Sequence, residues 1–179
     1  MPDAQLLRAA EIFTTRLQTL SELLKMAEGQ WHERGKDPEA LLAARLADDM
    51  FPLPSQVYFV CKQANDLAAW CSGTPAPVAD PKTFTFNDMT RHIADAALRL
   101  KNAAAQSESG VLKREKRTDL IDGLYLQQTG EAYIEDLITP NFYFHLVTAY
   151  GILRKEGVQI GKKDYMAHLG PFIKRTPAG

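Results

Sequence analysis

The stretch LLRAAEIFTTRLQTLSELLKMAEGQW, residues 6–31, decides the fold class of this chain. Its apolar residues recur in alternating steps of four and three positions, at Leu6, Ala10, Phe13, Leu17, Leu20, Leu24, Ala27 and Trp31. This spacing gathers them into one continuous stripe along a long amphipathic helix, which we expect to end near Gly35. A stripe of this length needs other apolar faces to pack against.

Two later stretches carry the same pattern. One stripe consists of Leu53, Val57, Val60, Ala64, Leu67 and Cys71, and the other of Phe86, Met89, Ile93, Ala96, Leu100 and Ala104. The run SGTPAPVADPK, residues 72–82, lies between them and predicts a connecting loop, because its prolines and glycine disfavour a helix. Thr85 and Asp88 have the spacing of a capping box at the start of the third helix.

Shorter elements are predicted around these helices. Asp37 followed by Pro38 predicts the start of a short helix that continues through Leu46. Between residues 107 and 130 the helical pattern fails. The pair Asp122-Gly123, which lies between apolar residues, predicts a β-hairpin with a tight primed turn.

The last third of the chain predicts a short helix over residues 131–138 and a fourth long helix to about Glu156. Thr139 and Pro140 are expected to restart or kink the chain between them, as a cap and a first-turn proline, and Gly157 is expected to end the long helix. The sequence therefore predicts an all-α, antiparallel four-helix bundle with short extra helices and a small β-hairpin insertion. We expect a single domain over residues 1–170 and a flexible tail over residues 171–179.

Composition and charge narrow the classes of partner. The chain has 21 basic and 22 acidic residues and a net charge of −1, which argues against nucleic acid and membrane surfaces as partners. Asp3, Arg8 and Glu11 interrupt any apolar run near the start, so we expect a cytoplasmic protein. Cys61 and Cys71 lie ten residues apart on one helix, about 15 Å, which is too far for a disulfide and predicts reduced thiols.

One polar cluster interrupts the apolar stripe of the fourth helix. Asn141, His145 and Thr148 are spaced so that they share one helix face, and that face overlaps the face predicted to point inward. Buried polar groups need hydrogen-bond partners, so the cluster is either a structural core histidine with its neighbours or a place for a ligand. The sequence contains no GxGxxG, GxxxxGK[ST], CxxC or HExxH motif.

Two stretches of the chain resemble a known family. They are TPNFYFHLVTAYGILRKEGVQIGKKDY, residues 139–165, and AARLADDMFPLPSQV, residues 43–57. Both are similar to the DUF1993 family of bacterial proteins, a domain of unknown function, which looks like a branch of the DinB and YfiT-like four-helix-bundle superfamily. The resemblance supports the predicted fold and implies no assigned activity.

DinB-like enzymes typically hold a divalent metal with three histidines, one on the second helix and two in an HxxxH on the fourth. This sequence departs from that pattern. The second histidine of the motif matches His145, the first falls on Asn141, and the remaining position falls near Gln56. Neutral amide oxygens are poor ligands for zinc or nickel, so the resemblance predicts no cofactor, and His145 is the one residue that could still bind a metal. The residues that remain, Gln56, Asn141, His145 and Thr148, predict a polar cavity for a small polar ligand.

Secondary candidates lie outside this cluster. Asp49 could act as an acid or base, and Lys162 and Asp164 belong to the GKKD segment of the resemblance. For these residues the alternatives are a solvated loop and a locally capped turn.

Two classes of function stay open at this stage, and whether the protein is an enzyme is undecided. The first is a small-molecule-binding or interaction module whose ancestral metal site is degenerate. The second is a transferase-type enzyme acting on a small thiol or electrophile, with or without a metal. A third interpretation gives the polar residues only a role in helix register. The resemblance, together with surplus aromatic residues Tyr58, Phe59 and Trp70 on the second helix, also predicts a homodimer.

Overall fold

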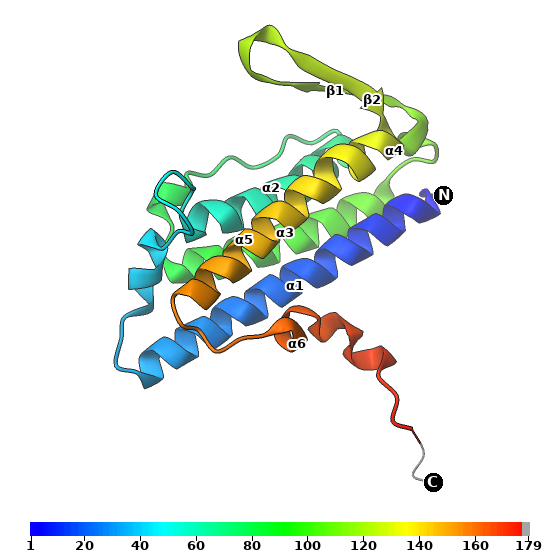
Figure 1. Ribbon diagram of the computed structural model, residues 1–179. Helices are drawn as coiled ribbons and strands as arrows, with labels where there is room; N and C mark the ends of the chain where they lie inside the picture. Colours follow the sequence, from blue (N-terminus) through cyan, green and yellow to red (C-terminus); the bar gives the residue numbers. More distant parts are fainter. Residues whose placement is uncertain (177–179) are drawn as a thin grey trace.

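Helices make up most of the computed structural model, which describes residues 1–176 (Figure 1). Within these residues the long helices are α1 (Ala4–Glu33), α2 (Leu53–Ser72), α3 (Phe86–Gln106) and α5 (Thr139–Lys155). The residues of the three predicted stripes are buried, apart from Cys71, which is partly exposed. The predicted all-α four-helix bundle is confirmed, because these stripes form one shared core.

Short elements connect the long helices. Before α3 they are η1 (Pro38–Ala43) and η2 (Pro81–Thr83). Between α3 and α5 they are η3 (Val111–Lys113), β1 (Glu115–Asp119), η4 (Ile121–Gly123), β2 (Tyr125–Thr129), α4 (Gly130–Ala132) and the π-helix η5 (Tyr133–Ile138). After α5 they are α6 (Lys162–Tyr165) and η6 (Ala167–Phe172).

The helices run in an up-down-down-up order. Near their first turns, Tyr58 of α2 stacks on His92 of α3, with ring centroids 5.8 Å apart, and at their last turns Cys71 and Ala103 line one hollow. Helices α2 and α3 therefore run in the same direction, while α1 and α5 run opposite to them (Figure 1). The expected antiparallel arrangement thus holds for α1 with α3 and for α2 with α5, but not for α2 with α3. The loop over residues 73–85 makes this possible, because it can extend to about 43 Å and α2 is about 30 Å long.

The predicted caps and turns are present. Thr85 and Asp88 form a capping box, in which each accepts a hydrogen bond from the backbone N–H of the other. Gly157 is left-handed, with φ of 79°. The hairpin turn is the predicted primed type, since Asp122 and Gly123 both have positive φ, of 56° and 74°.

The short helix expected through Leu46 instead ends at Ala43. Ala44 turns to extended geometry, with ψ of 137°, and its carbonyl oxygen accepts a hydrogen bond from the backbone N–H of Leu53 at 2.9 Å. That N–H begins α2 and has no acceptor within its own helix. The early end of η1 thus satisfies a donor of the next helix.

Of the two expected outcomes at Thr139 and Pro140, a restart or a kink, the restart does not occur. The chain stays helical from Gly130 to Lys155, and Ile138 and Thr139 both have helical backbone angles, so Thr139 caps nothing. A proline inside an α-helix lacks a donor and collides with the carbonyl four residues before it. The carbonyl four residues before Pro140 belongs to the wider π-turn η5, which ends at Ile138, and the helix continues past the proline unbroken.

The hairpin β1–β2 projects from the bundle, pairing Glu115 with Thr129 and Asp119 with Tyr125 (Figure 1). Gly130 joins it to the helix that follows, and the Gly130 N–H donates to the Arg114 carbonyl at 2.9 Å. A Cβ atom on Gly130 would lie 2.1 Å from the Trp70 ring and 2.9 Å from the Leu112 Cα. The hairpin base is therefore packed closely against α2.

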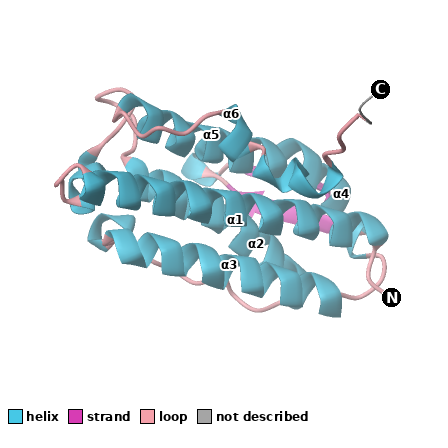
Figure 2. Ribbon diagram, turned by 90° about the horizontal axis from the view of Figure 1, so that it is seen from below, coloured by secondary structure: helices cyan, strands magenta, loops and turns pink. Residues whose placement is uncertain are grey.

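The C-terminal segment returns along α1, where α6 packs (Figure 2). The domain boundary expected after residue 170 falls inside η6, and residues 177–179 of the expected tail lie outside the described residues. None of the helices in the described part of the chain is long and apolar enough to span a membrane.

Candidate functional site

A glutamine and a histidine meet where α2 packs against α5. Gln56 is buried, and its Oε1 lies 2.8 Å from Nδ1 of the half-buried His145. The amide nitrogen of Gln56 donates to the backbone carbonyl of Phe51 at 3.0 Å. The side chain of Gln56 thus joins the entrance of α2 to the middle of α5.

This geometry fixes the tautomer of His145. The Phe51 carbonyl can only accept, so the amide nitrogen of Gln56 must face it and the amide oxygen must face His145. The hydrogen on the neutral imidazole therefore sits on Nδ1, and Nε2 carries a free lone pair. Burial lowers the pKa of His145 and favours this neutral form.

Two aromatic rings hold the imidazole in place. Phe59 stacks on it, with centroids 4.8 Å apart and planes 26° apart, and Phe144 approaches edge-on at 5.1 Å. The ring contacts add to the Gln56 hydrogen bond in restricting its rotation. His145 is thus an oriented hydrogen-bond acceptor.

The imidazole borders a hollow of about 290 Å³ between α2, the η5–α5 helix and β1. Apolar walls come from Phe59, Leu137 and Ile138, and polar groups come from Lys62, Gln63, Asp66, Thr118, Tyr133, Asn141 and His145. Because Nδ1 faces Gln56, Nε2 is on the opposite side of the ring, and no hydrogen bond to it occurs among residues 1–176. The imidazole of His145 lines the hollow, so a molecule bound there would contact this ring.

The four predicted site residues do not all meet. Asn141 lines the hollow, but its amide nitrogen donates to the Leu137 carbonyl at 3.0 Å. Thr148 is buried one turn further on, and its hydroxyl donates to the Phe144 carbonyl at 2.7 Å. Both side chains bond to the carbonyl four residues before them. The structure brings Gln56 and His145 into contact, and Asn141 lines the same hollow as His145 without bonding to either of them.

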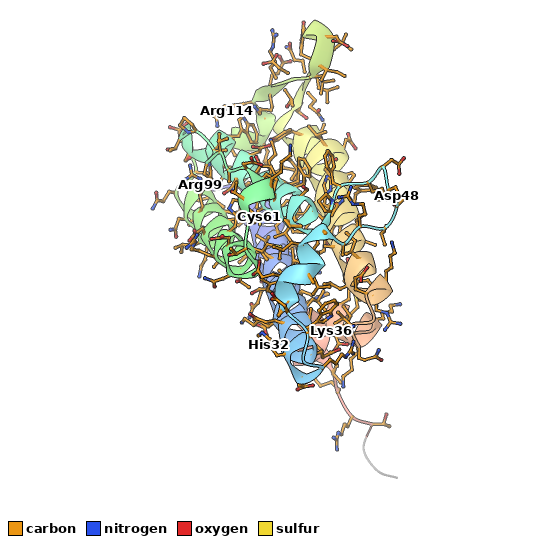
Figure 3. All side chains as sticks on the ribbon, turned by 90° about the vertical axis from the view of Figure 1, so that its left-hand side faces the viewer. His32, Lys36, Asp48, Cys61, Arg99 and Arg114 are labelled. Carbon is orange, nitrogen blue, oxygen red and sulfur yellow. The ribbon has the colours of Figure 1, made fainter. Side chains whose placement is uncertain are left out.

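The secondary candidates lie elsewhere. Asp49 is exposed on the surface loop that also carries Asp48 (Figure 3). Lys162 is exposed on α6, and Asp164 accepts a hydrogen bond from the Gly161 N–H at 2.7 Å as a helix cap. None of the three lines the His145 hollow.

Sequence reasoning missed several residues of the hollow. Phe59 lies one turn after Gln56 and could have been found from that spacing. Thr118 could not, because it comes from the hairpin and no periodicity relates it to either helix.

Comparison with known proteins identifies the family of this chain. The model of the family described as a domain of unknown function (DUF1993) matches residues 8–166. The chain belongs to the DUF1993 family. It is also similar to the crystal structure of a DinB family member protein from Shewanella denitrificans, at 30% identity and a TM-score of 0.73. That match covers 95% of this chain and 92% of the other. The search of curated proteins found no match to this chain.

The residues of this DUF1993 protein do not fit the three-histidine metal site of DinB-like enzymes. The amide oxygen of Gln56 already accepts from His145, and the amide of Asn141 bonds to its own helix. No group of three or more His, Cys, Asp or Glu side chains in the described residues could hold a metal ion. One imidazole nitrogen with no companion ligands makes a weak metal site.

His145 should contribute to the pH dependence of stability in this DUF1993 protein, together with His92 and His168, whose pKa values burial also lowers. The unfolded chain binds a proton at His145 near pH 6.5, and the folded chain binds it only at lower pH. The free energy of unfolding should therefore fall as the pH drops from about 6.5 toward the folded pKa, and stop changing through this group below it. Urea titrations across this pH range should show that the free energy of unfolding falls less steeply in a His145→Gln variant than in the wild type.

Nuclear magnetic resonance gives the matching control. In the wild type the ring nitrogen shifts should show hydrogen on Nδ1. In Gln56→Met, which removes the acceptor but keeps the volume, the Nε2–H tautomer should gain population. Equal tautomer populations in both proteins would contradict the role given to Gln56.

Proposed function

We propose that the protein is a non-enzymatic binding module that receives a small polar ligand in the hollow beside His145. The observation that carries the proposal is the neutral imidazole, held by Gln56 with its Nε2 lone pair free for a ligand. The hollow of about 290 Å³ combines three apolar with seven polar lining side chains, and its size suits a small polar molecule.

The chemistry of the thiols supports binding over catalysis. Cys61 is fully buried inside the bundle (Figure 3), and burial raises the pKa of its thiol well above the ordinary value. Burial also raises the pKa of Cys71, to about 11, against the opposing effect of Arg114. Thiols with raised pKa values are poor nucleophiles. Both cysteines are free, and we propose the cytoplasm as the location.

A second function has one observation in its favour. An imidazole oriented by a neighbouring amide resembles a general base held by its positioning residue. His145 could then take a proton from a small thiol that attacks an electrophile, as in a transferase. This alternative requires turnover, whereas the binding module does not.

The deciding experiment is native mass spectrometry, with elemental analysis, of protein purified without chelator. We expect no stoichiometric zinc or nickel. We also expect a small organic molecule, retained or taken up from a cell-extract metabolite fraction, that is lost in His145→Ala. The control is His32→Ala, because His32 is exposed at the end of α1 (Figure 3). This variant should keep the bound organic molecule.

Two outcomes would contradict this proposal. One equivalent of transition metal that disappears in His145→Ala would favour the enzyme. A ligand-free wild type, with an unfolding midpoint that falls in His145→Ala, would leave His145 only a structural role.

We also propose a homodimer, on a different surface from the one expected. Within the chain, Tyr58 stacks on His92, Phe59 stacks on His145, and Trp70 meets Tyr133 edge-on, so these rings need no partner. The surface that supports a dimer instead carries Phe51, Phe144 and Val147, which are 58%, 57% and 51% exposed. Light scattering at about tens of micromolar should give twice the chain mass, and a monomer in Val147→Glu. A wild-type monomer at that concentration would contradict it.

A further inference from the structure

A second hollow lies under the hairpin, beside the one that His145 borders. It has a volume of about 420 Å³, between β1, the end of α2 and the loop that follows. The two hollows share Asp66, Thr118 and Tyr133 in their walls. These three residues therefore lie between the His145 hollow and the space under β1.

Two hydroxyl groups in this shared wall are unpaired. Tyr133 is only 3% exposed, and its phenol oxygen makes no hydrogen bond to residues 1–176. The hydroxyl oxygen of Thr118 is buried and also has no partner in that range. Buried polar groups in folded proteins are almost always hydrogen-bonded, so the unmet Thr118 hydroxyl, in the same wall as a tyrosine hydroxyl that bonds to no described residue, points to a bound molecule.

The protonation state of Tyr133 makes it a donor. Burial, together with the nearby Asp66 and Cys71, raises the pKa of its phenol far above the ordinary value. The phenol thus stays neutral at physiological pH and presents an O–H group. The opposite role belongs to Nε2 of His145, which can only accept in the neutral tautomer.

The charges in the His145 hollow cancel. Lys62 and Asp66 form an ion pair at 2.5 Å, and the remaining polar groups that line this hollow are amides, hydroxyls and the imidazole. A charged ligand would have to break that pair or leave its own charge unmatched. The site therefore favours an uncharged molecule over an acid or an amine.

We propose that Tyr133 and Thr118 complete the ligand site begun by His145, and that the ligand is an uncharged amide or lactam. Its carbonyl oxygen accepts hydrogen bonds from the two hydroxyls, and its N–H group donates to Nε2 of His145. The apolar walls formed by Phe59, Leu137 and Ile138 cover the body of the molecule. This inference rests on the proposed function and adds the chemical class of the ligand.

The test uses three probes of similar size: pyrrolidinone, a neutral lactam; γ-aminobutyrate, its open-chain zwitterion; and pyrrolidine, a cation. Each is titrated into the protein while the imidazole resonances of His145 are followed by nuclear magnetic resonance. We expect pyrrolidinone to shift these resonances with a Kd of about millimolar, as its small size allows. The two charged probes should bind more weakly.

Variants separate the two halves of the site. Tyr133→Phe, which removes one oxygen and keeps the ring, should weaken pyrrolidinone binding about tenfold, the loss expected for one hydrogen bond. Thr118→Val should weaken it similarly. Tyr125→Phe, at an exposed tyrosine of β2, is the control and should bind as the wild type does.

The outcomes distinguish this inference from the proposed function. Unchanged binding in both Tyr133→Phe and Thr118→Val would overturn the inference and leave the His145 site standing. Tighter binding of either charged probe would overturn the uncharged class. If no probe shifts His145, the inference fails, and the mass-spectrometry comparison of wild type with His145→Ala still decides the proposed function.

Discussion

Replacing Phe142 by alanine is expected to lower the free energy of unfolding by about 3–5 kcal/mol. Phe142 of α5 is fully buried and stacks on the ring of Phe13 of α1, with centroids 4.6 Å apart and planes 20° apart. Truncation removes the buried ring, leaves a cavity in the core and ends the aromatic contact between the two helices. Urea denaturation followed by circular dichroism measures the change.

Phe144 provides the matched control on the same helix. It is 57% exposed and touches the edge of His145, so Phe144→Ala should cost about 1 kcal/mol or less. Equal losses from the two variants would mean that α1 and α5 do not pack through Phe13 and Phe142.

The Gly130→Ala variant should lose about 1–3 kcal/mol of stability. The added methyl would meet both the ring of Trp70, at 2.1 Å, and the backbone of Leu112, at 2.9 Å, so moving one side chain does not relieve the contact. Either the hairpin base shifts away from α2 or Trp70 leaves its place beside Tyr133. Thermal and urea unfolding measure the loss, and Trp70 fluorescence reports the displacement.

At a second glycine, substitution by alanine is expected to increase the stability of the protein. Gly29 lies within α1, is exposed, and has no atom within 4 Å of the position of an added Cβ. Gly29→Ala should therefore raise the free energy of unfolding by about 0.5–1 kcal/mol, through helix propensity alone. Similar effects from the two substitutions would show that the close packing at Gly130 is relieved at no cost.

Much of the fold was predictable because helical periodicity is a local property of the sequence. The stripes, the capping box at Thr85 and the hairpin turn at Asp122 depend on residues a few positions apart. The shared direction of α2 and α3 does not, because a loop such as residues 73–85 is long enough for either direction. The absence of the restart expected at Pro140 was not predictable from local sequence either, since the fit of this proline inside a helix depends on the π-turn before it.

The candidate site was predictable only in part. The pairing of Gln56 with His145 followed from the resemblance to DinB-like proteins and the helix faces, and the two side chains are in contact. Asn141 and Thr148 share a face with His145, yet each bonds to a carbonyl of its own helix, a partner available to short polar side chains in helices. Thr118 lines the hollow only through tertiary packing of the hairpin, and Tyr133 lines it through the π-turn that joins it to the helix of His145.

The π-turn η5 sets the rotational phase of the helix that carries half of this site. Twelve positions separate Tyr133 from His145, which in a regular α-helix would leave them about 120° apart around the axis. Each residue of a π-turn rotates the chain less than an α-helical residue does, and both side chains in fact line the same hollow. A single inserted or deleted residue between positions 133 and 138 would therefore change which side chain faces His145 while leaving the rest of the bundle in place. Length variation at this turn offers a route by which related chains could acquire different ligands without altering their cores.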